Sequence, residues 1–211
     1  MNLIYGTGHF LSTIFFDLFF SGDVAGVESI PKTGPYIIAA NHASYLDPPA
    51  IGCRVPREMC YFARKTLFKP GLPSWFLHKV NTIPVDLESD TDISSLKTVF
   101  RRLKEGDGIL LFPEGTRSHD GKLQEGRAGV GMIACRSQVP VVPARIFGSF
   151  EAYGRNQRFP NFHTPIDVAF APPLSFDDYN VPGRGKDRYQ AVSEKIMDAI
   201  GRIPPPPTIE I

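Results

Sequence analysis

The chain has 211 residues, of which 42% are hydrophobic and 21% are charged. This composition is typical of one globular domain with a substantial core, and it excludes the disordered and fibrous classes of protein. The formal net charge of +1 provides no overall positive field that would favour nucleic acid as a partner.

The first expected element is an amphipathic helix near the N-terminus. Residues Phe10–Phe20 read FLSTIFFDLFF, and both the short run and Asp17 disfavour a membrane-spanning helix, which needs about 20 apolar residues. On a helix, the apolar side chains that share one face are Leu11, Ile14, Phe15, Leu18 and Phe19. Two interpretations stay open: the helix lies in a membrane interface as a monotopic anchor, or it docks on its own domain.

Apolar runs and amphipathic helices alternate along the rest of the chain. The expected strands are Tyr36–Ala40, Met59–Ala63, Thr82–Val85, Gly108–Phe112, Val139–Phe147 and Ile166–Phe170. The expected helices are Ala50–Val55, Leu72–Val80, Ser94–Lys104, Ala128–Ser137 and a C-terminal helix lined by Tyr189, Val192, Ile196 and Ile200. This alternation predicts an α/β fold: a single domain with a largely parallel central sheet flanked by helices, preceded by the N-terminal amphipathic helical segment.

A polar segment follows the first long strand. It reads NHASYLD, from Asn41 to Asp47, and ligand sites of open α/β sheets lie outside the carboxyl ends of the strands. A neutral His42 imidazole can take the proton of an alcohol that attacks a thioester, which is worth roughly 10²–10⁴-fold in rate. Asp47 can hold the other ring nitrogen and stabilise the imidazolium. By spacing alone, a histidine and an aspartate that only cap turns would be the simpler interpretation.

A second polar segment changes that balance. It reads FPEGTRS, from Phe112 to Ser118, and it too follows an expected strand. A loop with exposed amide groups and an arginine suits phosphate binding, although a tight turn with a surface arginine has the same sequence features. Two polar loops marked by glycine or proline, both at strand ends, favour one shared site.

Together, the two segments resemble the glycerolipid acyltransferase family, which is best known for the 1-acylglycerol-3-phosphate acyltransferases. The family's N-H-x-x-x-x-D motif is met by Asn41, His42 and Asp47, and its F-P-E-G-T-R-S motif is met at every position of residues 112–118. The resemblance spans roughly residues 24–148. We therefore expect a membrane-associated amphipathic helix over residues 1–22 and an acyltransferase domain over residues 23–211.

The resemblance implies a role for each site residue. His42 would be the general base, and Asp47 would orient it. The implied substrate-binding residues are Asn41, Arg64, Lys65, Glu114, Gly115, Thr116 and Arg117. The family mechanism implies direct transfer in a ternary complex, with no acyl-enzyme intermediate, no metal and no resident cofactor.

The implied reaction moves a fatty acyl group from acyl carrier protein or coenzyme A to the free hydroxyl of 1-acylglycerol 3-phosphate, giving phosphatidic acid in phospholipid biosynthesis. One position departs from the family pattern, because Leu87 in the segment TIPVDL stands where an arginine is frequent. Another lysophospholipid, glycerol 3-phosphate or another amphiphilic alcohol is therefore an alternative acceptor. A non-catalytic lipid-binding protein and a thioesterase are further alternatives.

The remaining features bear on where the chain works. Cys53, Cys60 and Cys135 form no C-x-x-C pair, which favours three buried or half-buried thiols in a reducing compartment over disulfides or a zinc site. The N-terminal apolar run lacks the flanks of a signal peptide. Because a lysophospholipid acceptor partitions into membranes, we expect a peripheral or monotopic protein at the cytoplasmic face of the cell membrane. Residues Gly129–Ala134 fit G-x-G-x-x-A but follow a polar loop, so we expect close helix packing there.

Overall fold

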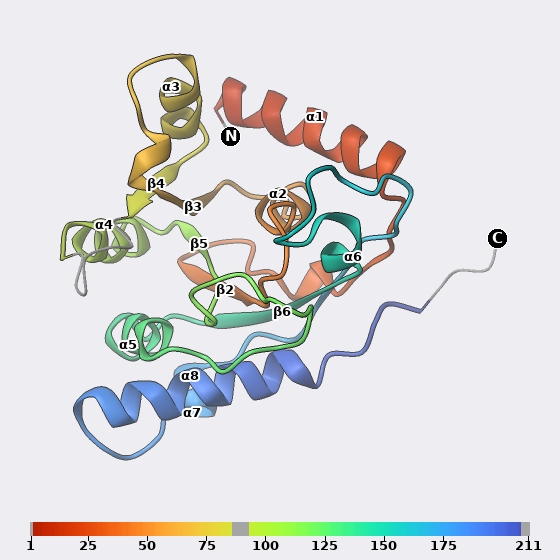
Figure 1. Cartoon of the computed structure of the whole chain (residues 1–211). Helices are drawn as coiled ribbons and strands as arrows, with labels where there is room; N and C mark the ends of the chain where they lie inside the picture. The colour runs from red at the N-terminus through yellow and green to blue at the C-terminus, as the bar shows by residue number, and fades with distance from the viewer. Residues whose placement is uncertain (1, 86–92, 208–211) are drawn as a thin grey trace.

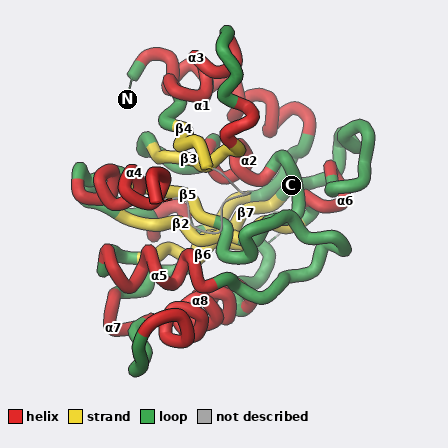
Figure 2. Tube along the Cα trace, turned by 60° about the vertical axis from the view of Figure 1, so that its left-hand side comes forward, coloured by secondary structure: helices red, strands yellow, loops and turns green. Residues whose placement is uncertain are grey.

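The computed structural model describes residues 2–85 and 93–207, in which a seven-stranded sheet is covered by helices on both faces (Figures 1 and 2). The strand order is β1-β7-β6-β2-β5-β3-β4. The strands are β1 (Val24–Ala25), β2 (Tyr36–Ala40), β3 (Met59–Arg64), β4 (Thr82–Val85), β5 (Gly108–Leu111), β6 (Val141–Phe147) and β7 (Asp167–Phe170). This arrangement confirms the predicted α/β fold with a largely parallel sheet.

The antiparallel pair β6–β7 is the exception to the parallel pairing. Residues 148–166 form the short helix α6 (Ser149–Tyr153) and a long loop. This connection begins and ends at the same end of the strands. The chain does not cross over to the other end before β7 begins, so β7 must run in the opposite direction. β1 then pairs with β7 in parallel at the margin of the sheet.

The other helices form a layer on each side of the sheet (Figure 1). They are α1 (Leu3–Phe19), α2 (Asp47–Gly52), α3 (Leu72–Lys79), α4 (Ile93–Lys104), α5 (Ala128–Ser137), α7 (Phe176–Tyr179) and α8 (Gly185–Gly201). The second helix begins at Asp47, three residues before its predicted start. Pro48 and Pro49 are compatible with this start, because the first turn of a helix needs no backbone donors.

Strand β2 lies at the centre of the sheet, and this position explains its continuous run of apolar residues. All its residues are 0% exposed, and successive side chains point to opposite faces. Ile38 and Ala40 pack in the cluster that includes residues of α1 and α2, whereas Ile37 and Ala39 pack in the cluster that includes residues of α4, α5 and α8. The two cores therefore meet across this strand.

Helix α1 docks on the domain through one side and exposes the other. Tyr5 and Phe16 are buried, and Thr13 donates a hydrogen bond to the carbonyl of Cys53. Its predicted apolar stripe largely faces outward, with Leu11 59% and Leu18 63% exposed. The helix therefore docks on its own domain while most of its apolar stripe stays uncovered, and its position in a membrane interface stays a prediction. Within the described residues, no helix is both long enough and apolar enough to cross a membrane.

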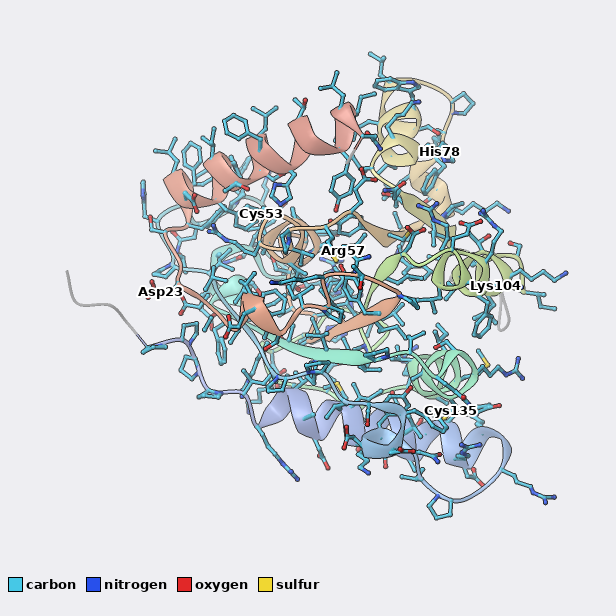
Figure 3. The ribbon with its side chains drawn as sticks, turned by 180° about the vertical axis from the view of Figure 1, so that it is seen from behind. Asp23, Cys53, Arg57, His78, Lys104 and Cys135 are labelled. Atoms are coloured by element: carbon cyan, nitrogen blue, oxygen red, sulfur yellow. The ribbon has the colours of Figure 1, made fainter. Side chains whose placement is uncertain are left out.

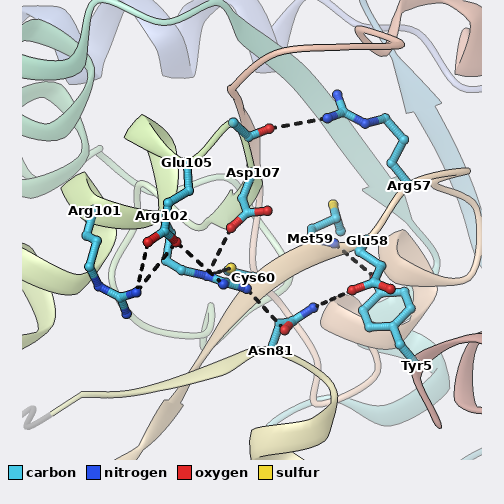
Figure 4. Close-up of polar contacts among 11 residues, drawn as sticks. Tyr5, Arg57, Glu58, Met59, Cys60, Asn81, Arg101, Arg102, Glu105 and Asp107 are labelled. Atoms are coloured by element: carbon cyan, nitrogen blue, oxygen red, sulfur yellow. Dashed lines mark hydrogen bonds and ion pairs between the residues drawn. The ribbon is translucent and has the colours of Figure 1, made fainter. Parts of the chain in front are cut away.

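A polar network joins elements at the amino ends of β3 and β5, the end of the sheet opposite the polar segments NHASYLD and FPEGTRS (Figure 4). Arg102 of α4 lies 3.0 Å from a carboxylate oxygen of Asp107 and donates to the side chain of Asn81 at 3.1 Å. The side chain of Asn81 in turn donates to Glu58 at 3.0 Å. These contacts tie α4 to the sheet and form no part of the site described below.

The three cysteines are free and buried. Cys53 packs in the cluster beside α1 and α2, whereas Cys135 belongs to α5 on the other side of the sheet (Figure 3). Burial raises the pKa of the Cys53 thiol to about 11 and raises that of Cys135 as well. The predicted set of buried thiols is therefore confirmed.

Candidate active site

The carboxyl ends of β2 and β5 bring the two polar segments together. These strands are parallel neighbours in which Ala39 pairs with Leu111, so the segments that follow them begin side by side. The amide of Ser118 donates to the carbonyl of His42 at 2.7 Å, and the amide of His42 donates to Glu114 Oε1 at 2.9 Å. Residues 42–47 and 112–118 therefore form one loop cluster.

His42 and Asp47 form a hydrogen-bonded pair within this cluster. His42 Nδ1 lies 2.8 Å from Asp47 Oδ2, and the amides of Ala43 and Ser44 donate to the same oxygen at 2.7 Å each. The Asp47 side chain is 0% exposed, and that of His42 is 18% exposed. An ionised carboxylate can only accept hydrogen bonds, so Nδ1 of a neutral His42 carries its proton toward Asp47 and Nε2 is left unprotonated.

The ring of His42 is also held by stacking. Its centroid lies 4.0 Å from that of Phe112, and the two planes are inclined by 16°. Phe112 is the residue that follows β5, so the strand itself positions the stacking partner. The orientation of the imidazole is thus determined by one hydrogen bond and one aromatic contact, which suits a base whose free nitrogen must meet a hydroxyl.

The side chain of Asn41 holds the loop that carries His42 against β6. Its side-chain amide donates to the carbonyl of Ile146 at 3.0 Å, and its side-chain oxygen accepts from the amide of Ile146 at 2.8 Å. The side chain thus extends the ladder between β2 and β6 by one more pair. Both polar groups of the Asn41 side chain bond to the backbone of Ile146, which positions the loop; the substrate-binding role that the resemblance implies stays a prediction.

Glu114 is likewise directed inward, toward the loop that carries His42. Its side chain is 2% exposed. Burial raises the pKa of the Glu114 carboxyl from 4.5 to about 7; the charge of Asp47 also raises it, while the amides of His42 and Gln124 oppose the shift. In this structure the Glu114 carboxyl joins the two segments by accepting from the amide of His42; the substrate-binding role that the resemblance implies stays a prediction.

The turn after Glu114 presents an arginine. The amide of Gly115 donates to the carbonyl of Phe112 at 3.0 Å, and Gly115 has a φ of +67°, which glycine adopts readily. Thr116 and Arg117 follow as half-buried residues. The guanidinium carbon of Arg117 lies 3.5 Å from the ring centroid of Tyr45, while its Nη1 is buried without a hydrogen-bond partner among the described residues. Arg117 is thus held by cation–π stacking and keeps donors for an anion.

Comparisons with known proteins identify the family of this chain. Residues 22–147 match the sequence model of a family described as Acyltransferase. This chain belongs to the acyltransferase family. A 1-acyl-sn-glycerol-3-phosphate acyltransferase of Bacillus subtilis is 36% identical over 123 residues, which cover 57% of this chain and 60% of the relative. A protein of the same name from Limnanthes douglasii is 31% identical over 160 residues, which cover 75% of this chain and 56% of the relative.

A solved structure resembles this chain over most of its length. It is the 1-acyl-sn-glycerophosphate (LPA) acyltransferase PlsC from Thermotoga maritima, with a TM-score of 0.68 and 26% identity. The match covers 93% of this chain and 76% of that one. The chain spans about half the length of the curated relatives it matches, between 41% and 60% for the first three. The family and the fold are thereby shown.

Two basic residues expected at the acyltransferase site lie farther along the same edge of the sheet. Arg64 ends β3, and Lys65 begins the 3₁₀ turn Lys65–Leu67. β3 is separated from β2 by β5, and within the described residues no hydrogen bond or ion pair joins Arg64 or Lys65 to the His42 loop. Leu87, the position that departs from the family pattern, lies outside the described residues.

The structure adds residues that the sequence did not single out. Ser44 donates through its amide to Asp47 and through its hydroxyl to the carbonyl of Tyr153 at 2.7 Å. The ring of Tyr45 lies 5.7 Å from that of Tyr153, between centroids. Tyr153 ends α6, beyond the residues that match the family model, and nothing in its local sequence indicates that it returns to the site.

Proposed function

We propose that this protein transfers a fatty acyl group from a thioester of acyl carrier protein or coenzyme A to the free hydroxyl of 1-acylglycerol 3-phosphate, giving phosphatidic acid. The observation that carries the proposal is the buried Asp47 that holds Nδ1 of His42 and leaves Nε2 free, beside an arginine with unpaired donors. The relatives support this acceptor, since each is named as a 1-acyl-sn-glycerol-3-phosphate acyltransferase.

In the proposed mechanism, His42 Nε2 takes the proton of the acceptor hydroxyl as its oxygen attacks the thioester carbonyl. The buried carboxylate of Asp47 stabilises the imidazolium that forms. Collapse of the tetrahedral intermediate breaks the carbon–sulfur bond, and the imidazolium returns the proton to the departing thiolate. The acyl group passes directly to the acceptor, and the reaction uses no metal and no resident cofactor.

Arg117 is proposed to bind the phosphate of the acceptor. A guanidinium forms two parallel hydrogen bonds with a phosphate, and one nitrogen of Arg117 has no partner among the described residues. Stacking on Tyr45 orients the plane of the guanidinium without using its donors. Gly115 lets the turn carry Thr116 and Arg117 out of the core immediately after the buried Glu114.

We also propose that the protein works as a peripheral or monotopic enzyme at the cytoplasmic face of the membrane. The exposed side of α1 carries Leu11, Ile14 and Leu18, and α3 exposes Trp75 and Phe76. A shallow groove of about 390 Å³ separates the two helices, and its lining is Leu3, Ile4, Thr7, Gly8, Leu11, Ser12 and Phe76. A continuous apolar surface of two helices fits the interface of a membrane, where the lipid acceptor resides.

The test measures products from purified protein in detergent with 1-acylglycerol 3-phosphate and each acyl thioester, identified by mass spectrometry. We expect phosphatidic acid from the parent and a roughly 10²–10⁴-fold lower rate from His42→Ala. His78→Ala is the matched control, because His78 is an exposed histidine on α3. Circular dichroism verifies that each variant is folded.

Other outcomes have distinct meanings. Transfer to other alcohols, but not to 1-acylglycerol 3-phosphate, would retain the chemistry and correct the acceptor. Release of free fatty acid without ester formation would identify a thioesterase. A folded parent that transfers no acyl group to any alcohol from either donor would overturn the enzyme proposal in favour of a lipid-binding role.

A further inference from the structure

The segment that follows α6 is fixed against the catalytic loop. Ser44 is 0% exposed, and its hydroxyl donates to the carbonyl of Tyr153 at 2.7 Å. Ser44 and Gly154 also form an isolated antiparallel bridge. Arg155 therefore directly follows a residue, Gly154, that is paired with Ser44 of the His42–Asp47 loop. Its backbone cannot move far without breaking those contacts.

Arg155 reaches from this segment to the other polar loop. Its Nη1 lies 3.1 Å from Nε2 of His119. A guanidinium can only donate, so Nε2 of His119 accepts this hydrogen bond as a neutral imidazole. His119 directly follows Ser118, whose amide is bonded to the carbonyl of His42. The Arg155–His119 contact thus connects two loops that each contact the catalytic loop.

Arg117 lies on the same group of loops. Its guanidinium stacks on Tyr45, and Tyr45 contacts the ring of Tyr153, two residues before Arg155. Asp120 lies three residues after Arg117, and its carboxylate accepts from the hydroxyl of Ser118 and the amide of Lys122. Asp120 is therefore engaged within its own turn and forms no ion pair with Arg155 or Arg117 in the described part of the chain.

We propose that Arg155 and His119 belong with Arg117 to the binding site for the phosphate of the acceptor. Arg155 is exposed, and among the described residues its one side-chain hydrogen bond is to a neutral ring nitrogen, so it can offer its remaining donors to a phosphate monoester. This assignment rests on the function proposed above. It supplies a second guanidinium beside the catalytic loop in a chain whose position 87 is leucine.

Phosphate monoesters occur on both substrates, since coenzyme A carries one on its ribose. The site is assigned to the acceptor, because Arg117 and Arg155 both lie on loops bonded to the loop of His42, which must meet the acceptor hydroxyl. The head group of 1-acylglycerol 3-phosphate places its phosphate two carbons from that hydroxyl. The ribose phosphate of coenzyme A is far from the thioester, so the position of the reacting carbonyl does not restrict where that phosphate binds.

The experiment compares Arg155→Gln with Arg158→Gln. Arg158 is an exposed arginine of the same loop whose guanidinium lies over the ring of Phe159, so it is the matched control. We expect Arg155→Gln to raise KM for 1-acylglycerol 3-phosphate by about 10- to 100-fold, the loss expected for one hydrogen bond to a charged group. The value of kcat and KM for the thioester should stay within about twofold, and Arg158→Gln should match the parent.

A binding measurement without donor separates this assignment from the proposed function. Isothermal titration of 1-acylglycerol 3-phosphate into the detergent-solubilised parent and variants needs no turnover. Weaker binding by Arg155→Gln supports the site even if the parent proves unable to transfer an acyl group. Unchanged KM and unchanged affinity in a folded Arg155→Gln variant overturn the site while leaving the reaction intact. A rise in KM for coenzyme A thioesters alone also overturns it.

Discussion

At the residue scale, two buried carboxyl groups, those of Asp47 and Glu114, hold His42 in place. Asp47 Oδ2 accepts from His42 Nδ1 and from two backbone amides, and the side chain is 0% exposed. Glu114 Oε1 accepts from the amide of His42. One carboxyl therefore orients the imidazole and the other holds the backbone that carries it, so side chains of both motifs converge on a single residue.

Glu114 supports a prediction about the pH dependence of stability. Burial raises the pKa of its carboxyl from 4.5 to about 7, so the folded state binds this proton more tightly than the unfolded state does. The resulting stabilisation is fully present below about pH 4.5 and is lost as the pH rises to about 7. Glu114→Gln keeps a carbonyl oxygen that accepts from His42 and cannot ionise.

We therefore expect the free energy of unfolding of Glu114→Gln to change less between pH 5 and pH 8 than that of the parent, by up to ~3 kcal/mol. Denaturant titrations at the two pH values measure it. Glu125→Gln, at an exposed position of the following loop, serves as the control and should behave as the parent does. Equal pH dependence in the parent and Glu114→Gln would show that the carboxyl does not titrate in this range.

At the element scale, α1 docks on the domain and leaves most of its apolar stripe exposed. His9 and Thr13 hydrogen-bond to the carbonyls of Val55 and Cys53, and Asp17 forms an ion pair with Arg54 at 2.6 Å. These contacts place the polar side of the helix against the domain. The apolar stripe is consequently turned outward.

The exposed stripe predicts membrane binding that separates from catalysis. We expect Leu11→Glu combined with Leu18→Glu to weaken cosedimentation with phosphatidylglycerol-containing vesicles by at least about tenfold, because each buried leucine contributes roughly 1.5–3 kcal/mol. Acyl transfer in detergent micelles should stay near the parent rate. Ile93→Glu is the control, since Ile93 is 59% exposed at the start of α4. Unchanged vesicle binding by the double variant would show that α1 is not part of the membrane-binding surface.

At the scale of the whole molecule, the packing of α5 against α8 explains the glycines of the G-x-G-x-x-A sequence. A Cβ on Gly131 would lie 1.9 Å from the carbonyl oxygen of Tyr189 in α8, whereas a Cβ on Gly129 would meet nothing within 4 Å. The predicted reason for this pattern, close helix packing, is confirmed. Gly131 lets the two helices approach closely over the core beneath β2 and β6.

These two glycines form a matched pair for a stability test. We expect Gly131→Ala to lower the free energy of unfolding by about 1–3 kcal/mol or more, because α8 must shift away from α5. Gly129→Ala should be neutral or stabilising by up to about 1 kcal/mol, since alanine restricts the unfolded chain. Thermal and denaturant unfolding measure both. A parent-like Gly131→Ala variant would mean that the helices can separate at little cost.

Local patterns in the sequence were sufficient for the α/β class, the main strands and the two polar segments. Burial on both faces demands a continuous apolar strand, and the periodicity of α4 and α8 demands an amphipathic helix, so these features can be read from neighbouring residues. The His42–Asp47 pair also follows from a short segment, because five residues of chain that turn into a helix bring the two side chains together. The boundaries of α2 were less accurate, since Pro48 and Pro49 permit an earlier start.

Contacts between distant segments were decided by the tertiary structure alone. The pairing of β2 with β5 and β6, the antiparallel direction of β7 and the outward side of α1 all depend on which surfaces meet after the chain has folded. The same holds for the inward direction of Glu114 and for the return of Tyr153 to the loop that carries His42. Periodicity reports whether a residue is covered, but the identity of the covering segment is a property of packing between elements far apart in the chain.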